Sequence, residues 1–385
     1  MSPYGLNRFG GVRSHIQGLG EALVARGHSV TVIAPGAVNE EPRTRGDGPF
    51  PGHHHETGDP GMLGTLPVIR CGDVRPWDFS GTHFDVAWAS RAACRAALAP
   101  GFDLLHLHTL WNPAVPLQLA LRFPGVRVAT FHDVPGDATP WWARALMPIG
   151  AALLRHVVLD AAIAVSPAVS SYLGAGTHAL IPNGIGDPLF GTTPPGSLDA
   201  SAAAPVVYLG RLEARKDVGT LLEAMARVHA VLGEATPPLV IAGDGPQRGA
   251  LEAQACRLGL TRVRFEGAVQ EHEKWALLAN ARCVVAPSRA GESFGIVLLE
   301  VMRAGSVPVA ADNPGYRHVL SHGGESLLFP AGDTNALATL LMRVCRDAAW
   351  REAMRCWGVA RWPRFAWTRV AEDVERVYVH AISAA

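Results

Sequence analysis

Short, uniformly apolar runs alternate with amphipathic stretches along most of the chain. In the first half, the apolar runs cover residues 29–34, 104–108, 126–132, 161–165 and 179–182. Parallel strands that are buried on both faces have this composition, whereas half-exposed strands alternate apolar and polar positions. Amphipathic helical stretches lie between these runs, so the pattern predicts an α/β fold with parallel sheets.

The same alternation begins again after residue 205. The expected strands are 206–209, 239–242, 263–266, 283–287 and 307–310, and the expected helices are 218–232, 247–258, 274–280 and 295–303. Between the halves, residues 187–205 are rich in Pro, Ser and Ala without periodicity, which is typical of a linker. We therefore expect two Rossmann-like domains, 1–186 and 206–362, whose parallel sheets face a ligand-binding cleft.

The balance of charge excludes a partner that is recognised through bulk charge. The 385 residues carry 34 Lys plus Arg and 34 Asp plus Glu, so no nucleic-acid partner is expected. Six Cys are scattered without a C-x-x-C pair, which disfavours a zinc site or disulfide framework and favours a reducing cytoplasm. The N-terminus has no signal-peptide pattern, and charged residues interrupt the longest apolar stretch, 149–169, so no transmembrane span is expected.

Two segments leave alternatives open. Residues 36–61 are rich in Gly, Pro and charge and predict a loop, whose His53, His54 and His55 are either solvated or bind a metal. Residues 140–156 carry paired Trp and flanking Arg, so this segment either lies at a lipid interface or forms a core helix. Peripheral contact with the inner membrane face is therefore one of two expectations.

The segment "GESFGIVLLE", residues 291–300, places an acid near each end of an apolar run. It predicts a loop that becomes a helix near Gly295, and a helix throughout would put Glu292 and Glu300 on one face, where both could contact one elongated ligand. The N–H groups of residues 293–295 would then suit phosphate or sugar oxygens at a helix N-terminus. The alternative is that Glu292 only caps the helix and Glu300 is solvated.

Other candidate groups follow expected strands. Gly210 ends one strand and is followed by Arg211 and Lys216, whose charges suit a diphosphate, although basic loop residues are often only solvated. His132 ends another strand and is either a ligand for a sugar hydroxyl or structural. No D-x-D metal motif occurs, so charge for a diphosphate would come from Arg, Lys and helix ends, and no metal or other cofactor is expected.

Six motifs occur together in a recognisable order: "GGV", "FH", "IPNGI", "GRL" followed by a Lys, "GDGP" and "GESFGIVLLE". In this the chain resembles the retaining glycosyltransferases of family four, which have the two-domain GT-B fold, and within them the actinobacterial phosphatidylinositol mannosyltransferase branch. The resemblance implies that the last segment, 363–385, is a helix that crosses back to the first domain. It also implies transfer of a hexose with retention, without a metal, from a nucleotide sugar to an acceptor.

The resemblance assigns roles to matching positions. Arg211, Lys216, Glu292 and His132 would be catalytic, the last two at the transferred sugar. Donor contacts would come from Gly11, Gly210, Val269, Glu271, Lys274, Ser293, Phe294, Gly295, Ile296 and Glu300. Within this set, Glu300 would hold the ribose, while Glu271 and Lys274 would read a guanine, because guanine offers N–H donors to an acid and a carbonyl to a lysine. This favours GDP-mannose over a UDP-sugar; Tyr4 and Arg13 would face the acceptor.

The acceptor itself is not specified, and a glycan, a lipid-linked group or a small molecule all remain expectations. Arg13 stands where the branch has Gln, Asp133 and Asp137 follow "FH" without a lysine, and Asp217 replaces a common Gly. The apolar strand that normally precedes "SPY" is absent, so we expect the true start to lie upstream of Met1. Two alternatives are a GT-B nucleotide-sugar epimerase and a non-catalytic sugar-nucleotide-binding protein.

Overall fold

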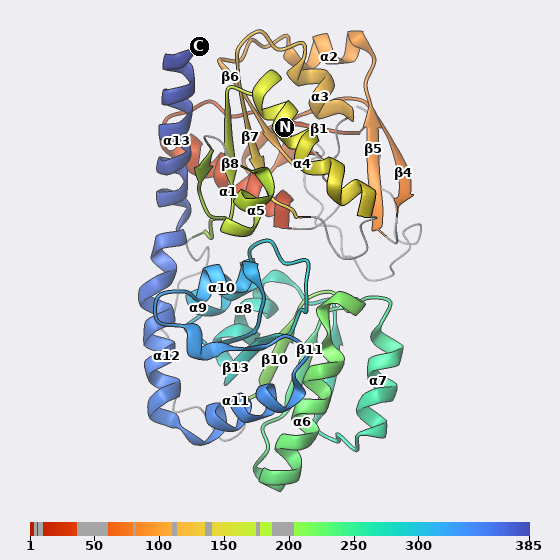
Figure 1. Cartoon of the computed structure of the whole chain (residues 1–385), viewed down its shortest axis with the longest axis vertical. Coiled ribbons are helices and arrows are strands. Elements are labelled where there is room, and N and C mark those ends of the chain that lie inside the picture. The colour runs from red at the N-terminus through yellow and green to blue at the C-terminus, as the bar shows by residue number, and fades with distance from the viewer. Residues whose placement is uncertain are drawn as a thin grey trace. The chain divides into compact units, whose positions relative to one another are not determined.

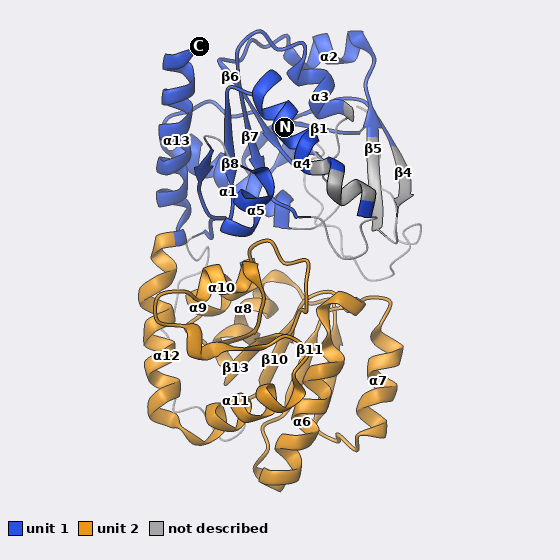
Figure 2. Cartoon of the chain, in the orientation of Figure 1, with its two compact units in different colours: residues 1–48, 54–186, 365–385 blue, residues 49–53, 187–364 orange. Residues whose placement is uncertain are grey.

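The computed structural model describes residues 1–3, 6, 11–36, 61–79, 82–109, 114–134, 141–174, 178–186 and 204–385. Several sequence expectations lie outside these residues, namely those for Tyr4, Asp137, the three consecutive His at 53–55 and most of the expected linker. The described chain divides into two compact units, coloured separately in Figure 2. The first holds the described residues up to Gly186 together with Phe365–Ala385, and the second holds residues 204–364.

The first unit contains a parallel sheet of four strands in the order β6-β7-β8-β9 (Figure 1). These strands are Leu104–His108, Val126–Phe131, Ala161–Ala164 and Ala179–Leu180. All four fall within the apolar runs of the sequence, which confirms the α/β expectation for this region. The helices of this unit are α1 (Gly11–Ala25), α2 (Arg91–Leu98), α3 (Ala114–Ala120), α4 (Trp141–Val157), α5 (Pro167–Leu173) and α13 (Trp367–Ala384).

Five further strands in this unit form two small sheets. The apolar run 29–34 supplies only β1 (Val32–Ala34), which pairs in parallel with β3 (Leu66–Arg70), and β2 (Met62–Leu63) pairs antiparallel with β3. The other sheet is the hairpin of β4 (Asp73–Phe79) and β5 (Thr82–Trp88). The sequence analysis missed β2 to β5, because Pro67, Pro76 and interspersed charges break the apolar pattern there.

The first two residues lie between β1 and β6. Ser2 donates its N–H to the carbonyl of Ile33 at 2.8 Å, and His108 donates its N–H to the carbonyl of Met1 at 3.3 Å. The Met1 amino group donates to the carbonyl of His106 at 2.6 Å, and burial lowers the pKa of this amino group to about 5. These bonds connect the sheet that contains β1 to the sheet that contains β6, through backbone groups that would otherwise be buried without partners.

Helix α13 covers the parallel sheet of the first unit and packs against α1, β7 and β8. Its buried face is apolar and joins a core cluster that includes Leu23, Val128, Ile163, Val370 and Val374. At its start, the Trp367 indole lies between two glycines, because a Cβ on either Gly18 or Gly184 would overlap the indole ring. The close approach of α13 to α1 therefore depends on the absence of a side chain at residue 18.

The second unit is a six-stranded parallel sheet in the order β12-β11-β10-β13-β14-β15. Numbered from its first strand, this is the 3-2-1-4-5-6 order of a Rossmann-type sheet. The strands are Val206–Leu209, Leu239–Ala242, Val263–Gly267, Cys283–Ala286, Pro308–Asp312 and Leu328–Pro330 for β10 to β15. The helices are α6 (Val218–Leu232), α7 (Arg248–Arg257), α8 (Glu271–Asn280), α9 (Ile296–Arg303), α10 (Pro314–Leu320), α11 (Thr334–Arg346) and α12 (Ala348–Arg361).

Most of these boundaries agree with the sequence pattern, and β10, β11 and α6 agree to the residue. Helix α8 is an exception, because it begins three residues before the expected Lys274. A capping box explains the earlier start: Gln270 donates its N–H to the Glu273 carboxylate at 2.7 Å. None of the described helices is both long and apolar enough to span a bilayer.

The Trp367 contact gives a first prediction. Gly18→Ala raises intrinsic helix propensity by up to about 1 kcal/mol, but the added methyl collides with the indole, and such overpacking typically costs about 1–3 kcal/mol. We expect a lower midpoint in thermal unfolding. The matched control is Gly150→Ala in α4, where a Cβ meets nothing within 4 Å, so propensity alone acts and the midpoint rises or stays unchanged. Equal shifts in both variants would contradict the role of the contact.

Candidate active site

The order of the second sheet locates the candidate site. Strands β10 and β13 are neighbours, and the chain leaves them toward opposite sides of the sheet. In open parallel sheets, the loops after two such strands diverge and leave a crevice at the strands' carboxyl ends. The loop after β10 carries Arg211 and Lys216, and the loop after β13 carries Glu292 and Gly295. The two motifs that the sequence analysis singled out thus meet at the switch point of this sheet.

Glycines bring the backbone together beside this crevice. Gly210 donates its N–H to the carbonyl of Ala242 at 3.0 Å, and a Cβ on Gly243 would overlap the carbonyl oxygen of Gly210. Gly243 also has φ of 143°, which side chains disfavour. The "GDGP" and "GRL" motifs therefore pack against each other through their backbones at Gly243 and Gly210, and these backbone segments border the site.

The cations after β10 pair with the acid after β13. Lys216 lies 2.6 Å from the Glu292 carboxylate, and Arg215 lies 3.1 Å from the same oxygen. Arg215 and Arg211 also contact Glu213, at 2.9 and 2.8 Å. Only 19% of the Lys216 side chain and 12% of the Glu292 side chain are exposed, whereas Arg211 is 63% exposed. Lys216 and Glu292 are thus a positioned pair, and Arg211, which contacts Glu213, is the most exposed of these three cations.

The loop before α9 agrees with the expected helix start near Gly295, but it does not meet the condition for a shared face of the two acids. Helix α9 begins at Ile296, and Gly295 precedes it with φ of 101°, so no continuous helix joins the two acids and they do not share a helix face. Glu292 does not cap α9 either, since its carboxylate is bonded to Lys216 and Arg215. A Cβ on Gly315 would overlap the carbonyl of Glu292, so this loop lies directly on the start of α10.

The second acid belongs to a separate charge cluster. Glu300 accepts a hydrogen bond from Lys274 at 2.7 Å, and Lys274 also lies 2.7 Å from Glu271. Burial alone would lower the pKa of Lys274, but the charges of Glu300 and Glu271 outweigh burial and raise it. Glu271 is mostly exposed and accepts from the Trp275 indole at 2.9 Å. The three residues expected at the base and ribose are therefore adjacent, and Glu300 is not merely solvated.

The remaining expected donor residues flank these clusters. Val269 is half-buried in the turn before α8, and Ser293 and Ile296 are half-buried on either side of Phe294 and Gly295, which are buried. The backbone of the 293–296 segment thus adjoins Glu292, as the motif predicts. No described contact tests whether these groups bind a nucleotide sugar, so their roles remain predictions.

The backbone conformation and contacts of Asp217 account for its presence where related sequences commonly have Gly. Asp217 has φ of 50° and ψ of 42°, the left-handed region in which Gly carries no penalty and Asp is among the better tolerated residues. Its carboxylate accepts hydrogen bonds from Arg289 at 2.6 Å and Thr220 at 2.7 Å. The Asp side chain therefore bonds the loop after β13 to the start of α6, which a Gly could not do.

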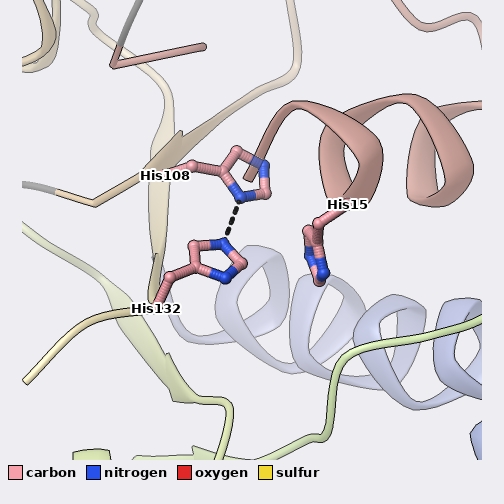
Figure 3. Close-up of side chains that lie close together, drawn as sticks. All are labelled: His15, His108 and His132. Atoms are coloured by element: carbon pink, nitrogen blue, oxygen red, sulfur yellow. Dashed lines mark hydrogen bonds between the residues drawn. The ribbon is translucent and has the colours of Figure 1, made fainter. Parts of the chain in front are cut away.

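In the first unit, His132 belongs to a buried group of aromatic rings (Figure 3). It follows β7, and its Nε2 lies 3.1 Å from Nδ1 of His108, which ends β6. The His15 ring from α1 stands edge-on to the His132 ring, with centroids 4.5 Å apart. Burial lowers the pKa of His132 to about 4, partly offset by Asn183, and lowers the pKa of His15 and His108 well below 6.5. All three rings are therefore neutral at pH 7.

The two other residues expected from the first unit lie at the start of the helix that carries His15. Gly11 is the exposed first residue of α1, and Arg13 is half-buried in its first turn. Tyr4 lies outside the described residues. The part of the chain that the structure describes therefore places Gly11 and Arg13 within one turn of His15, while their roles toward donor and acceptor remain predictions.

Sequence reasoning missed several neighbours of the expected residues. Arg215 bonds to Glu292 directly, but it was passed over beside the motif Lys216. His15 and His108 escaped notice because a lone His gives no motif; the signals available were "HLH" at a strand end and a His one turn after "GGV". Since β6 and β7 are adjacent and parallel, both of these strands deliver a terminal His to the same edge.

The two units match two sequence families. Residues 9–187 match the family described as Glycosyltransferase Family 4, and residues 201–357 match Glycosyl transferases group 1. The chain is 32% identical to a phosphatidyl-myo-inositol mannosyltransferase of Mycobacterium leprae over 389 residues, covering 98% of this chain and 94% of the relative. A protein of the same description from Mycobacterium tuberculosis strain H37Rv is also 32% identical, with the same coverage of both chains.

Solved structures agree with this assignment. Sucrose-phosphate synthase from Thermosynechococcus elongatus is 25% identical and superposes with a TM-score of 0.72, covering 98% of this chain and 94% of that one. The Anabaena HepE protein in complex with UDP and glucose is 20% identical with a TM-score of 0.70 over 97% of both chains, and supports the fold. These results favour glycosyl transfer over the epimerase and non-catalytic alternatives. With relatives of this identity over nearly its whole length, the chain belongs to the retaining glycosyltransferases of family four, which have the GT-B fold of two Rossmann-like domains.

Proposed function

We propose that this glycosyltransferase moves mannose from GDP-mannose to a lipid-linked acceptor. The observation that carries the choice of donor is the Glu271–Lys274–Glu300 cluster, with both ion pairs at 2.7 Å. An acid and a lysine at this place can satisfy the N–H donors and the carbonyl of guanine, while a second acid receives ribose hydroxyls. The mannosyltransferase names of the relatives support mannose as the transferred sugar.

The chemistry rests on charge stabilisation by the loop after β10. When the sugar leaves, negative charge grows on the diphosphate, and Lys216 and Arg211 would neutralise it. Lys216 is already held in place by Glu292, so little reorganisation is needed when the diphosphate binds. In the retaining mechanism implied by the family, the leaving phosphate helps to take the proton of the acceptor hydroxyl, and no metal or other cofactor takes part.

The test of the donor is thermal unfolding with GDP, UDP and ADP and their sugar conjugates, without added metal. A ligand at a hundred times its dissociation constant stabilises the folded protein by about 2.7 kcal/mol, which is measurable. We expect GDP to give the largest shift, and we expect Glu271→Gln to reduce the preference for GDP over UDP. Glu234→Gln, an exposed acid in the same unit, is the control that leaves the preference unchanged. A UDP-selective shift in the wild type would contradict the guanine assignment.

The two charge clusters predict different kinetic defects. Glu300→Gln removes a charged acceptor of ribose hydroxyls, and hydrogen bonds to charged groups contribute about 1.5–3 kcal/mol, so we expect nucleotide binding to weaken about tenfold to a hundredfold. Lys216→Met removes a cation that acts on the leaving group, so we expect kcat to fall about a hundredfold to a thousandfold with a smaller change in KM. Steady-state kinetics with saturating acceptor separate the two effects.

The control for both variants is Arg257→Met on α7, a basic residue outside the clusters, which should leave kcat and KM unchanged. If Glu300→Gln and Lys216→Met both behaved like this control, the proposed site in the second unit would be wrong. Catalysis of sugar transfer would then have to depend on other residues.

The proposal of a lipid-linked acceptor rests on the exposed face of α4. Leu146, Ile149, Leu153 and Val157 are 57–69% exposed and recur at helical spacing, so they form one apolar stripe along the helix. Trp141 at its start is 82% exposed, and Trp side chains favour the membrane interface. A stripe of this kind is typical of a helix that lies in the plane of a lipid surface, and the core-helix alternative does not account for it.

Vesicle sedimentation tests this surface. We expect the wild-type protein to co-sediment with phosphatidylglycerol–phosphatidylcholine vesicles, and we expect the triple variant Leu146→Gln, Ile149→Gln, Leu153→Gln to stay in solution, because each buried apolar side chain contributes about 1.5–3 kcal/mol. Val231→Gln, an exposed apolar position on α6 in the other unit, is the matched control and should sediment like the wild type. Equal sedimentation of the triple variant would contradict the membrane role of α4.

A further inference from the structure

One group of buried side chains in the first unit has the composition of a metal site. Among the residues that the structure describes, His15, His108 and His132 bring one ring nitrogen each to within 4.8 Å of the others (Figure 3). Each side chain is at least 96% buried, with 3%, 3% and 4% exposure. Three imidazole nitrogens around one point are good ligands for zinc and for other divalent first-row transition metals.

Two of the three rings are already close to the required geometry. His108 Nδ1 and His132 Nε2 are 3.1 Å apart. In a tetrahedral site with metal–nitrogen bonds of about 2.0–2.1 Å, two ligand nitrogens lie about 3.3 Å apart. The ring of His15 would need to approach by at most about 1.5 Å to complete such a site. The sheet holds the backbones of His108 and His132 near each other, because β6 and β7 are adjacent strands.

The His15 ring packs edge-on against Trp367 and His132, but its hydrogen bonding is incomplete. Neither ring nitrogen of this buried side chain has a hydrogen-bond partner of good geometry, although the Asn183 side chain lies close enough to affect its pKa. The Oδ1 atom of Asn183 is also buried without a partner of good geometry. Buried polar atoms in folded proteins are nearly always satisfied, so the His15 nitrogens and the Asn183 oxygen need a partner that a bound ion or a water would supply.

We propose that His15, His108 and His132 bind one divalent first-row transition-metal ion, with zinc as the type, and that the fourth position is open to water or to Asn183. Metal binding releases no proton. The proton shared between His108 and His132 moves to the other nitrogen of the ring that carries it, and the two facing nitrogens then each donate a lone pair to the metal. His106 stays outside the site, because Tyr378 and Thr130 occupy its two nitrogens at 2.5 and 2.8 Å.

No step of transfer uses this ion, but one of its ligands, His132, is also the residue that the resemblance assigns to the transferred sugar. An ion on His132 would therefore compete with the sugar for this side chain. Metal binding is therefore measured without nucleotide, and a negative result leaves the transferase proposal untouched.

The experiment uses the full chain with His53→Ala, His54→Ala and His55→Ala as background, because those three consecutive His can bind metals by themselves. Chelator-treated protein is titrated with CoCl2, and bound metal is followed by visible absorption and equilibrium dialysis. We expect one Co²⁺ per chain, the intense visible bands of a tetrahedral ion, and displacement by Zn²⁺. Loss of an outer-sphere partner already weakens metal sites about tenfold to a hundredfold, so loss of a ligand in His15→Gln should weaken binding at least as much.

The matched control is His28→Gln, an exposed His of the same unit that pairs with Glu375, and it should bind Co²⁺ like the background protein. Folding of each variant is checked by its thermal transition. If His15→Gln does not fold, X-ray absorption of the zinc-loaded background protein counts imidazole ligands directly. Three imidazoles support the proposal. Fewer than three, no bound metal in the background protein, or unchanged binding in folded His15→Gln would overturn it.

Discussion

The strand order of the second unit is the constraint from which its chemistry follows. Because β10 and β13 are neighbours in the sheet while their following loops leave in opposite directions, polar groups can gather at one edge without competing for core space. The glycines at 210 and 243 let the backbone close up at that edge. Every charged residue assigned to the donor in this unit lies on a loop or helix that follows β10, β13 or β12, and β11 separates β12 from β10 in the sheet.

Much of the second unit was predictable because β10, β11, β13 and β14 are buried on both faces. Uniform apolar runs such as 206–209 and 239–242 are too short for helices and therefore indicate strands, and their bounds agree with the structure. The helix that starts at Glu271 was placed three residues late because its first turn is polar, although Gln270 and Glu273 form a readable capping box. The hairpin β4-β5 was missed because residues 73–88 mix charged, Pro and aromatic residues and contain no uniform apolar run.

The site was predictable in its residue types but not in its pairing. Motif order identified Lys216, Glu292, Lys274 and Glu300, yet nothing in a linear sequence says that each lysine binds one of these acids. The helix start near Gly295 was predicted, whereas a shared face for Glu292 and Glu300 required a continuous helix, which Gly295 in the left-handed region interrupts. The histidine cluster was not predicted as a group, because its members come from three separate places in the chain: α1, the end of β6 and the residue after β7.

The pairing of these lysines has a consequence for selectivity in a cell full of anions. In the free protein, Lys216 and Lys274 are each neutralised by a neighbouring carboxylate, so inorganic phosphate or a stray polyphosphate meets little net attraction there. To capture either lysine, an anion must displace an acid and leave it desolvated. A ligand that carries hydroxyls beside its phosphates can satisfy the displaced acids at the same moment. The site therefore favours molecules that carry both phosphates and hydroxyls.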